Sequence, residues 1–482
     1  MIVYDYLIIL FPVIKSQGSE QMKAPEKLYE GNMHKKYLLF AIPLILSGFL
    51  SQSYNFINSM MIGKHLGSDA FAATAVTAEL LQLFSSVLWG YLTGIGIYVS
   101  ILFGKGDYEK MRNIIKINFM FSTVFALLVS VGCNLFCPQI FDILNVNDEI
   151  YKDAERYFRT YVCGYPILQL TWGFMYIANG MGLTKVPLIA SIVTGVINVF
   201  LNYLFLSVWG KGIHYSALAT AIASAITLIA YLIIFARLFK NLNIPLKGFS
   251  VCKEDLKFSV DYGMPTMLQQ MTMYACTTLV SPLINTCTTA ALSGYTIANK
   301  GRNLITTIYQ NSSKANTTCL AQAMGAGKIN KIKEGIRIGF TLSLLLSGVF
   351  MGLLLIFARE FTSLFLDPVK DAESFTVSVN IIWFLLPFLL FNVVNNLFHG
   401  IFRAVGSGKL MFISTMIYAV SYVIYAYIFF AILPFDMRIY GVHLALSGAY
   451  ITEVIFAAVI FFAGKWKSAE YKNLENQNTH ML

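Results

Sequence analysis

Ionisable side chains inside otherwise apolar segments are the residues of this sequence most able to do chemistry. Glu79 lies inside the apolar segment 70–103, and Glu453 lies deep inside 440–464. A carboxylate within a bilayer is costly, so it is a functional candidate by default. We interpret Glu79 first, and Glu453 second, as groups that couple to an ion. The structural alternatives are a static ion pair of Glu79 with Lys300 or another cation, and a packing hydrogen bond or helix-to-helix pair for Glu453.

A polar stripe extends from Glu79 along one face of its segment. Gln82, at i+3, and Trp89, at i+10, share that face at helical spacing. The sequence repeats itself 221 residues later, where the equivalent stripe holds Lys300, Asn303, Thr307, Gln310 and Lys314. Polar faces of membrane helices turn inward, so we expect both stripes to line a cleft between two halves of the protein. For the two lysines, a structural pair or snorkelling toward the interface is the alternative.

Other helical faces carry amides, an aromatic ring and a guanidinium. Those that we expect to line the same cleft are Asn55, Asn58, Gln270, Tyr274, Asn395, Asn396 and Arg403. The competing interpretation is interhelical hydrogen bonding for the Asn and Gln side chains, and anchoring at the membrane interface for Arg403 and the nearby His399. The histidines are scattered along the chain, so no metal site, cofactor or enzyme active site is predicted.

The segments that hold these residues are too long and too apolar for a soluble protein of this size. The chain has 482 residues, of which 57% are hydrophobic and only 12% are charged. In a bilayer the backbone must satisfy its own hydrogen bonds, so apolar runs of this length form helices. We predict an all-α polytopic membrane protein with twelve spans, at about residues 37–62, 70–103, 113–136, 155–182, 187–209, 215–239, 258–285, 290–322, 335–358, 375–404, 410–433 and 440–464.

Charges in the connecting segments set the orientation of these spans. Lys and Arg gather before the first span and after the second, sixth, eighth and twelfth, whereas Asp and Glu gather after the third and ninth. The positive-inside rule then places both termini in the cytoplasm of a cell whose plasma membrane the chain spans. The predicted parts are a cytoplasmic N-terminal segment at 1–32 whose first 21 residues extend upstream of the natural start, an N-lobe at 33–240, a linker at 241–257, a C-lobe at 258–466 and a cytoplasmic tail at 467–482.

The two halves of the chain resemble each other. GKGDYEKMRNIIKINF at 104–119 matches GAGKINKIKEGIRIGF at 325–340, and Pro43 corresponds to Pro265. Each half holds six predicted spans, an even number, so both halves insert in the same direction. The pseudo-twofold axis that relates the two six-helix lobes is therefore expected along the membrane normal.

Five motifs resemble those of the multidrug and toxic compound extrusion (MATE) transporters, and the resemblance covers about residues 28–465. They are LYEGNMHKKYLLFAIPLILSGFLSQSYN, GKHLGSDAFAA, AALSGYTIANKGRN, AQAMGAGKINK and FHGIFRAVGSGK. The resemblance implies two lobes around a central cleft that opens alternately to each side of the membrane. It also implies export of small, often cationic and aromatic compounds, driven by an inward proton or sodium gradient.

The first helix departs from the family pattern at one position. The family commonly carries an aspartate just before an Ile-x-x-Gly-like turn, and the matching residue here is Asn58. An amide does not take up and release a proton near neutral pH. The roles that stay open for Asn58 are a hydrogen bond to substrate and a share in coordinating an ion.

The sequence therefore predicts a monomeric secondary active antiporter that exports small amphipathic compounds. No Gly-x4-Gly-Lys-Ser/Thr phosphate loop is present, so ATP is not the expected fuel. The alternative on the same fold is a flippase or exporter for lipid-linked saccharide or another anionic substrate, which Lys300, Lys314 and Arg403 leave open. No nucleic-acid partner is expected despite the net charge of +10, because the basic residues follow the orientation rule.

Overall fold

The computed structural model of the protein describes residues 27–143, 146, 148–242 and 252–479. Every regular element within those ranges is a helix, and each predicted span falls on a helical stretch, so the all-α membrane class is confirmed. In the described ranges, nine helices are long and apolar enough to cross a membrane. The stretches predicted at 155–182, 258–285 and 290–322 are helical but more polar, so the count of twelve spans stays a prediction.

The chain divides into two compact units, each with its own core. Unit 1 is built mainly from Leu46–Met264, and unit 2 from Leu28–Ile45 together with Pro265–Leu482. The start of the first predicted span therefore belongs to unit 2, and the start of the seventh belongs to unit 1. The predicted lobe boundaries, 33–240 and 258–466, stay predictions.

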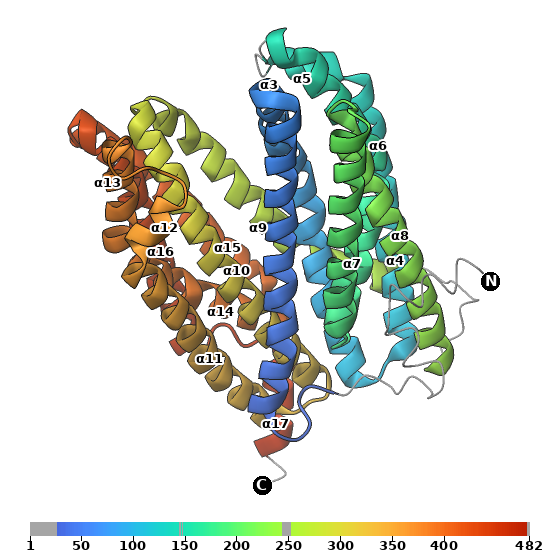
Figure 1. Ribbon diagram of the computed structural model, residues 1–482. Coiled ribbons are helices and arrows are strands. Elements are labelled where there is room, and N and C mark those ends of the chain that lie inside the picture. The colour runs from blue at the N-terminus through green and yellow to red at the C-terminus, as the bar shows by residue number, and fades with distance from the viewer. Residues whose placement is uncertain (1–26, 144–145, 147, 243–251, 480–482) are drawn as a thin grey trace. The chain divides into compact units, whose positions relative to one another are not determined.

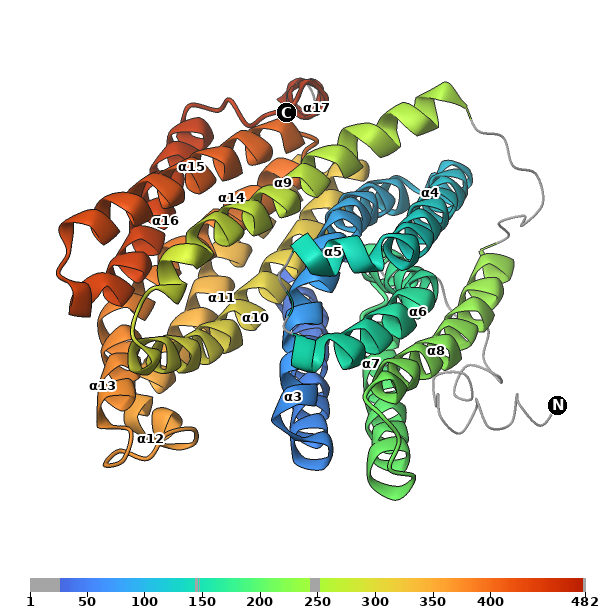
Figure 2. The ribbon, with the colours of Figure 1, turned by 90° about the horizontal axis from the view of Figure 1, so that it is seen from above.

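Unit 1 is a bundle in which α6 packs against α4 and α8, and α8 packs against α7 (Figures 1 and 2). Its core includes Phe141, Phe158 and Leu206, all buried. Its helices are α3 (Met33–Lys105), whose start lies in unit 2, α4 (Tyr108–Leu135), α5 (Cys137–Ile143), α6 (Asp148–Gly180), α7 (Lys185–Asn202), the π-helical η1 (Tyr203–Val208) and α8 (His214–Asn241).

A glycine divides the very long helix α3 into two spans. Gly67 has φ 89° and ψ −177°, a backbone conformation that L side chains rarely adopt. The two parts that are long and apolar enough to cross a membrane are Met33–Gly67 and Val76–Lys105. The turn that the sequence places at GKHLGSD therefore coincides with this break.

Unit 2 is centred on α10, which packs against α11, α13 and α14, while α15 packs along α16 (Figure 2). Its large core includes Tyr309, Tyr418 and Tyr450. Its elements are α9 (Lys253–Asn285), whose start lies in unit 1, α10 (Thr289–Gly325), α11 (Ile329–Ile356), α12 (Ala358–Ser363), α13 (Ala372–Asn380), η2 (Ile381–Leu385), η3 (Leu386–Phe388), α14 (Leu389–Ala404), α15 (Gly408–Ile432), η4 (Phe435–Met437), α16 (Arg438–Phe462) and α17 (Ala469–Thr479).

A proline interrupts the tenth predicted span. Pro387 has no N–H to donate, and its ring would collide with the carbonyl four residues earlier in a regular α-helix. The chain responds by widening to a π-helix over Ile381–Leu385 and tightening to a 3₁₀ turn over Leu386–Phe388. The span therefore consists of α13 and α14 joined through an irregular middle.

The internal repeat is visible in two turns of the same geometry. After α3, the Asp107 N–H donates to Leu102 O and Gly106 has φ 80°; after α10, the Lys328 N–H donates to Ala323 O and Gly327 has φ 68°. Both turns are the left-handed glycine cap that closes a helix C-terminus. The matched sequences at 104–119 and 325–340 thus share one local fold.

The start of α3 is bound into unit 2 by polar contacts. The Tyr37 hydroxyl lies 2.9 Å from Ser312 O, 2.8 Å from Ser312 Oγ and 3.0 Å from Ser343 Oγ. The start of α9 is held in unit 1 by rings, because Tyr98 stacks on Phe258 and on Tyr262.

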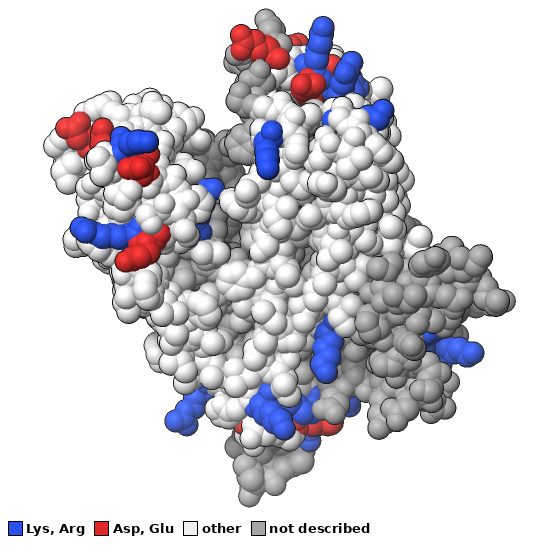
Figure 3. Space-filling model, in the orientation of Figure 1, with Lys and Arg blue, Asp and Glu red and all other residues white. Residues whose placement is uncertain are grey.

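The surface fits a bilayer. On the face shown in Figure 3, acidic and basic side chains gather over the ends of the helices in each unit, and the surface between is mostly uncharged. Large apolar side chains such as Leu128, Phe200 and Ile356 are exposed. In water these would be a liability, whereas lipid tails cover them at no cost.

Candidate functional site

A buried ionisable cluster lies in unit 2, where four helices meet. Glu453 of α16 has its Oε1 atom 3.1 Å from Nε2 of His399, which α14 contributes. Gln269 of α9 places its Nε2 atom 3.0 Å from the other ring nitrogen, Nδ1. Ser414 of α15 donates to Glu453 Oε1 at 3.4 Å. All four side chains are buried, so this carboxylate and imidazole are shielded from water and lipid.

The partners of His399 determine how many protons the cluster can hold. An amide presents either a donor or an acceptor according to its orientation. Gln269 can therefore donate to a neutral imidazole, or accept from the Nδ1–H of an imidazolium. The His399 Nε2 atom is at ion-pair distance from Glu453, but its N–H is not aligned for a hydrogen bond. The pair can thus hold one proton more or fewer while keeping the Gln269 contact.

Because the cluster is buried, the gain or loss of that proton changes the energy of the pair strongly. An ionised Glu453 beside a neutral His399 is a net negative charge in a buried site, which is costly. One added proton, on either residue, makes the pair neutral overall. Arg403 of α14 donates its Nε–H to the His399 carbonyl at 3.2 Å, so this N–H is not donated to the Glu453 carboxylate. The arrangement places a carboxylate and an imidazole where one proton can lie between them.

Unit 1 holds a second polar cluster, built from amides. Asn58 of α3 donates to Asn198 of α7 and accepts from Asn202 at 3.2 Å. Asn198 in turn donates to Thr220 of α8 at 3.0 Å. None of these four side chains is ionisable near neutral pH. The cluster therefore joins three helices, and in the structure Asn58 acts as an interhelical hydrogen-bonding residue.

Comparison with known families decides what kind of protein contains these clusters. The MatE family model matches the chain twice, over residues 43–204 and over residues 265–428. This chain belongs to the MATE family. The two matches begin at Pro43 and Pro265, the same pair of prolines that the internal repeat aligns.

Curated relatives of this MATE chain are named for drug resistance and export. The probable multidrug resistance protein YpnP of Bacillus subtilis is 24% identical over 91% of this chain and 97% of its own length. The probable multidrug resistance protein YoeA of the same organism is 24% identical over 73% and 77%. The multidrug export protein MepA of Staphylococcus haemolyticus is 23% identical over 80% and 85%.

Solved structures show the same fold. A MOP superfamily transporter from Pyrococcus furiosus superposes with a TM-score of 0.84 at 19% identity, over 94% of this chain and all of that one. A multidrug resistance MATE transporter in an outward-facing conformation gives 0.84 at 18%, over 94% and 99%. The two-lobe architecture predicted for this MATE chain is thereby confirmed.

The predicted site residues of unit 1 do not form one group. The side chain of Glu79 lies outside the described residues, although its backbone is part of α3. Asn55 and Gln82 are exposed. Trp89 is half-buried and meets Trp172 of α6 edge-on, with 4.9 Å between ring centroids.

The predicted residues of unit 2 fall into two groups. Near the buried cluster, Asn395 donates to Tyr450 O at 3.1 Å and Asn396 donates to Asn392 O at 2.9 Å. Further from it, Lys300 is exposed, with its ammonium 4.8 Å from the centre of the Phe365 ring. The remaining candidates are Gln270, Tyr274 and Lys314, all half-buried, and Asn303, which is exposed.

Sequence reasoning missed several residues that the structure brings forward. Gln269 is the neighbour of the predicted Gln270, and His399 lies on the polar face of the tenth predicted span but is not among the predicted site residues. Arg302 and His443 were not singled out at all. A signal was present for Arg302, since a guanidinium within a membrane-spanning segment is a functional candidate by the same argument as Glu453.

Proposed function

We propose that this chain is a secondary active antiporter that exports small amphipathic, drug-like compounds in exchange for protons. It would act as a monomer in the plasma membrane by alternating access, with both termini in the cytoplasm. Membership of the MATE family and the drug-export names of its relatives support the cargo class. The basic segments at the ends of the spans support the orientation.

The observation that carries the proposal is the buried pair of His399 and Glu453. A carboxylate and an imidazole 3.1 Å apart can hold one proton between them, and Gln269 accommodates either state of the ring. Coupling then needs one further property: the proton must leave when the cargo is taken up. A buried pair meets that need, because deprotonation leaves a net charge that a conformational change or a cation must offset.

The donor set of this site favours a proton over sodium. Hard cations of this kind are bound by several oxygen ligands. Around Glu453 the structure places an imidazole nitrogen and the donating Ser414 hydroxyl. One carboxylate with donor groups about it makes a poor sodium site and a good proton site.

Cargo recognition is proposed for the half-buried aromatic surface of unit 1. Trp89 and Trp172 are both half-buried and meet at an interplanar angle of 61°, and aromatic rings of this kind suit a flat guest. Glu79, which the sequence predicts as an ion-coupling group, stays a candidate for that role. Asn58 is proposed to hold the surrounding helices in place rather than to carry a proton.

An anionic cargo on the same fold is the second candidate. The observation that favours it is Arg302, whose guanidinium lies inside unit 2 and whose Nε has no hydrogen-bond partner in the described structure. A lipid-linked saccharide would need several such cations along its path. The carboxylate of Glu453, paired with His399, is not one of the cations that such a cargo needs, and so drug export is the stronger proposal.

Efflux from drug-hypersensitive cells tests the proposal. Cells that express the wild-type protein are loaded with ethidium or a fluoroquinolone, and efflux is followed after a protonophore is added or after external sodium is removed. We expect efflux to stop with the protonophore and to continue without sodium. Efflux that persists with the protonophore and stops without sodium would overturn proton coupling, and no efflux of either compound from well-expressed protein would overturn the cargo class.

A further inference from the structure

An arginine inside unit 2 has no counter-charge in the described part of the chain. Arg302 lies on α10, well inside the helix, and is half-buried with its Nε atom fully buried and without a hydrogen-bond partner. Two other arginines have polar partners: Arg159 pairs with Glu155 at 2.8 Å, and Arg112 donates to Asn113. A guanidinium cannot shed its proton to escape burial, so its charge has to be compensated by something else.

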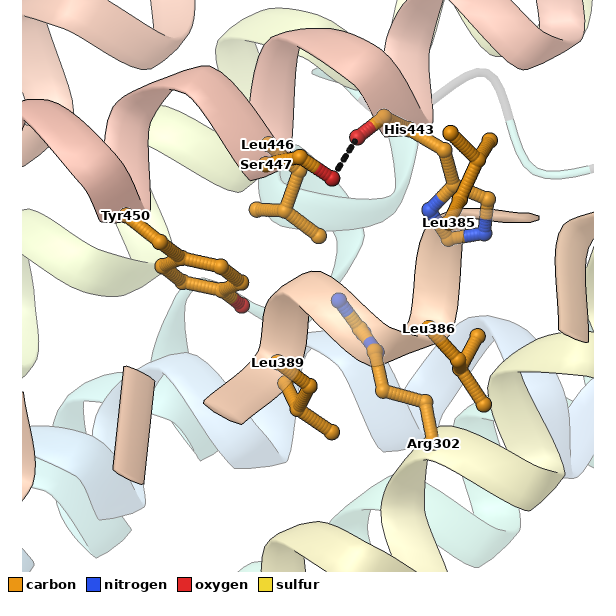
Figure 4. Close-up of a pocket in the computed structure, with 8 residues that line it drawn as sticks. All are labelled: Arg302, Leu385, Leu386, Leu389, His443, Leu446, Ser447 and Tyr450. Atoms are coloured by element: carbon orange, nitrogen blue, oxygen red, sulfur yellow. Dashed lines mark hydrogen bonds between the residues drawn. The ribbon is translucent and has the colours of Figure 1, made fainter. Parts of the chain in front are cut away.

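Arg302 borders a small cavity that polar and apolar side chains line together (Figure 4). The polar residues are Arg302 and three residues of α16: His443, Ser447 and Tyr450. The apolar residues are Leu385, Leu386, Leu389 and Leu446. None of the eight lining residues is acidic.

The histidine on this cavity also lacks a partner. His443 is 3% exposed and its Nε2 atom has no hydrogen-bond partner among the described residues. Its ring packs against Tyr295, with 4.9 Å between centroids, which fixes the plane of the imidazole. A buried polar atom without a partner is rare in proteins and calls for an occupant of the space it faces. Two independent groups, a guanidinium and an imidazole, therefore face one cavity.

The nearest acid on α16 is already committed. Glu453 lies one turn beyond Tyr450, yet its carboxylate is 3.1 Å from His399 and accepts from Ser414. It does not form an ion pair with Arg302 in this structure. The charge of Arg302 is thus available to pair with an anionic group that enters from outside.

The break at Pro387 explains why there is space at this depth. Leu385 ends the π-helical turn, Leu386 begins the 3₁₀ turn and Leu389 begins α14. The irregular backbone spaces these side chains differently from a regular helix, which leaves room opposite Arg302. Interrupted helices at membrane depth occur where they line a cavity or a binding site.

We propose that the cavity bounded by Arg302, His443, Ser447 and Tyr450 is a binding site for a single small anionic group. The cavity volume is about 10 Å³, enough for one water-sized atom. A halide, or one oxygen of a carboxylate, fits with slight adjustment of the leucines, whereas sulfate and phosphate are too large. The anion would accept from the guanidinium and from an imidazole N–H, which are charge-assisted and neutral hydrogen bonds respectively.

Two sources share this chemistry, and binding to purified protein distinguishes them. Radiolabelled chloride is bound to the full-length protein in detergent, and unlabelled competitors are added at constant ionic strength. One arm uses chloride, a second uses acetate and a third uses a fluoroquinolone together with its methyl ester. Competition by chloride alone assigns an inorganic anion; competition by acetate and the free acid, but not the ester, assigns the carboxylate of a cargo. Sulfate is the oversized reference and should not compete.

A variant links binding to this cavity. Arg302→Gln should lower chloride binding at least tenfold, whereas Arg359→Gln, the same change at an exposed arginine of α12, should leave it unchanged. Arg302→Lys keeps the charge and should bind with intermediate affinity, which covers the case in which Arg302→Gln does not fold. The proposal is overturned if wild-type protein binds neither chloride nor a carboxylate, since water then fills the cavity, or if folded Arg302→Gln binds as wild type does. None of these readouts depends on export, so failure here leaves the proposed function intact.

Discussion

His399 Nε2 and Glu453 Oε1 lie 3.1 Å apart on two different helices of unit 2, and both side chains are buried. The alternatives for this acid were ion coupling and a helix-to-helix pair, and the structure shows a pair whose second member can itself be protonated. A pair of that kind can hold the helices together and hold a proton.

Neutral replacement of Glu453 should abolish coupled export while leaving the protein folded. Glu453→Gln keeps the size of the side chain and the hydrogen bond from Ser414, but it removes the ionisable group. We expect drug efflux to fall at least tenfold, measured as ethidium efflux from cells with matched expression. Glu360→Gln, the same change at an exposed acid of α12, is the control. Equal loss in both variants would point to a general defect and contradict this role.

Restoring an acid in the first helix should not help. Asn58→Asp removes the amide donor to Asn198 and sets two oxygen atoms against each other. We expect this to destabilise the protein by about 1–3 kcal/mol, the cost of an unsatisfied buried polar group, and not to increase efflux. The neighbouring Asn55→Asp is exposed and should be close to neutral in a thermal unfolding assay. An increase in proton-driven efflux in Asn58→Asp would show that this position can couple directly.

The start of α3 should depend on the Tyr37 hydroxyl. Tyr37→Phe removes the contacts to Ser312 and Ser343, but those two hydroxyls remain 2.7 Å apart and keep each other as partners. The expected loss of stability is therefore about 1 kcal/mol, near the mean for one hydrogen bond. Thermal unfolding in detergent measures it. Tyr427→Phe, which removes one 3.4 Å contact at an exposed site, should change stability less, and an equal effect would count against the buried network.

The C-terminal helix should detach more readily in acid. Lys467 donates to Glu475 at 2.8 Å and Lys333 approaches it at 3.6 Å, so the hydrogen bond from Lys467 lowers the pKa of Glu475 below its usual value. A pKa lowered by folding gives stability that is present above the ordinary glutamate range and lost as the pH falls through the lowered value. Lys467 and Glu475 are partly exposed, with 30% and 26% of their side-chain surface accessible, so the contribution of the pair is below about 1 kcal/mol.

Hydrogen exchange of α17 tests this pH dependence. At neutral pH, Glu475→Gln should exchange faster than wild type, and at a pH below the glutamate range the two should exchange alike. The control is Glu470→Gln on the same helix, which should follow wild type at both pH values. A difference between Glu475→Gln and wild type that persisted in acid would mean that the ion pair is not the cause.

Length and apolar character were enough to predict most helices. The range predicted as 215–239 is α8, His214–Asn241, and 410–433 is α15, Gly408–Ile432. Backbone hydrogen bonding in lipid leaves few alternatives to a helix, and glycine turns such as the one at Gly106 mark the ends. The division of α3 between two units was not predictable in the same way, because it depends on packing of Tyr37 against helices about 275 residues away.

The site was predictable only in part, because it depends on the rotation of separate helices about their axes. Glu453 stands out alone as an acid in an apolar segment. Its partners come from α9, α14 and α15, and nothing in one sequence shows that Gln269, rather than Gln270, faces His399. Arg302 was hidden among the polar residues around it on α10, where successive residues point about 100° apart. The widened turn before Pro387, which leaves room for its cavity, follows from three-dimensional packing.

Proton release on cargo binding tests the central claim most directly. Purified protein in weakly buffered detergent solution is mixed with ethidium, and the pH change is recorded alongside the amount of ethidium bound. The account predicts that the wild-type protein releases about one proton for each ethidium bound, as expected for one proton shared by His399 and Glu453, and that Glu453→Gln binds ethidium with no release. The same proton release from Glu453→Gln as from wild type would contradict the account, because the exchanged proton would then reside elsewhere.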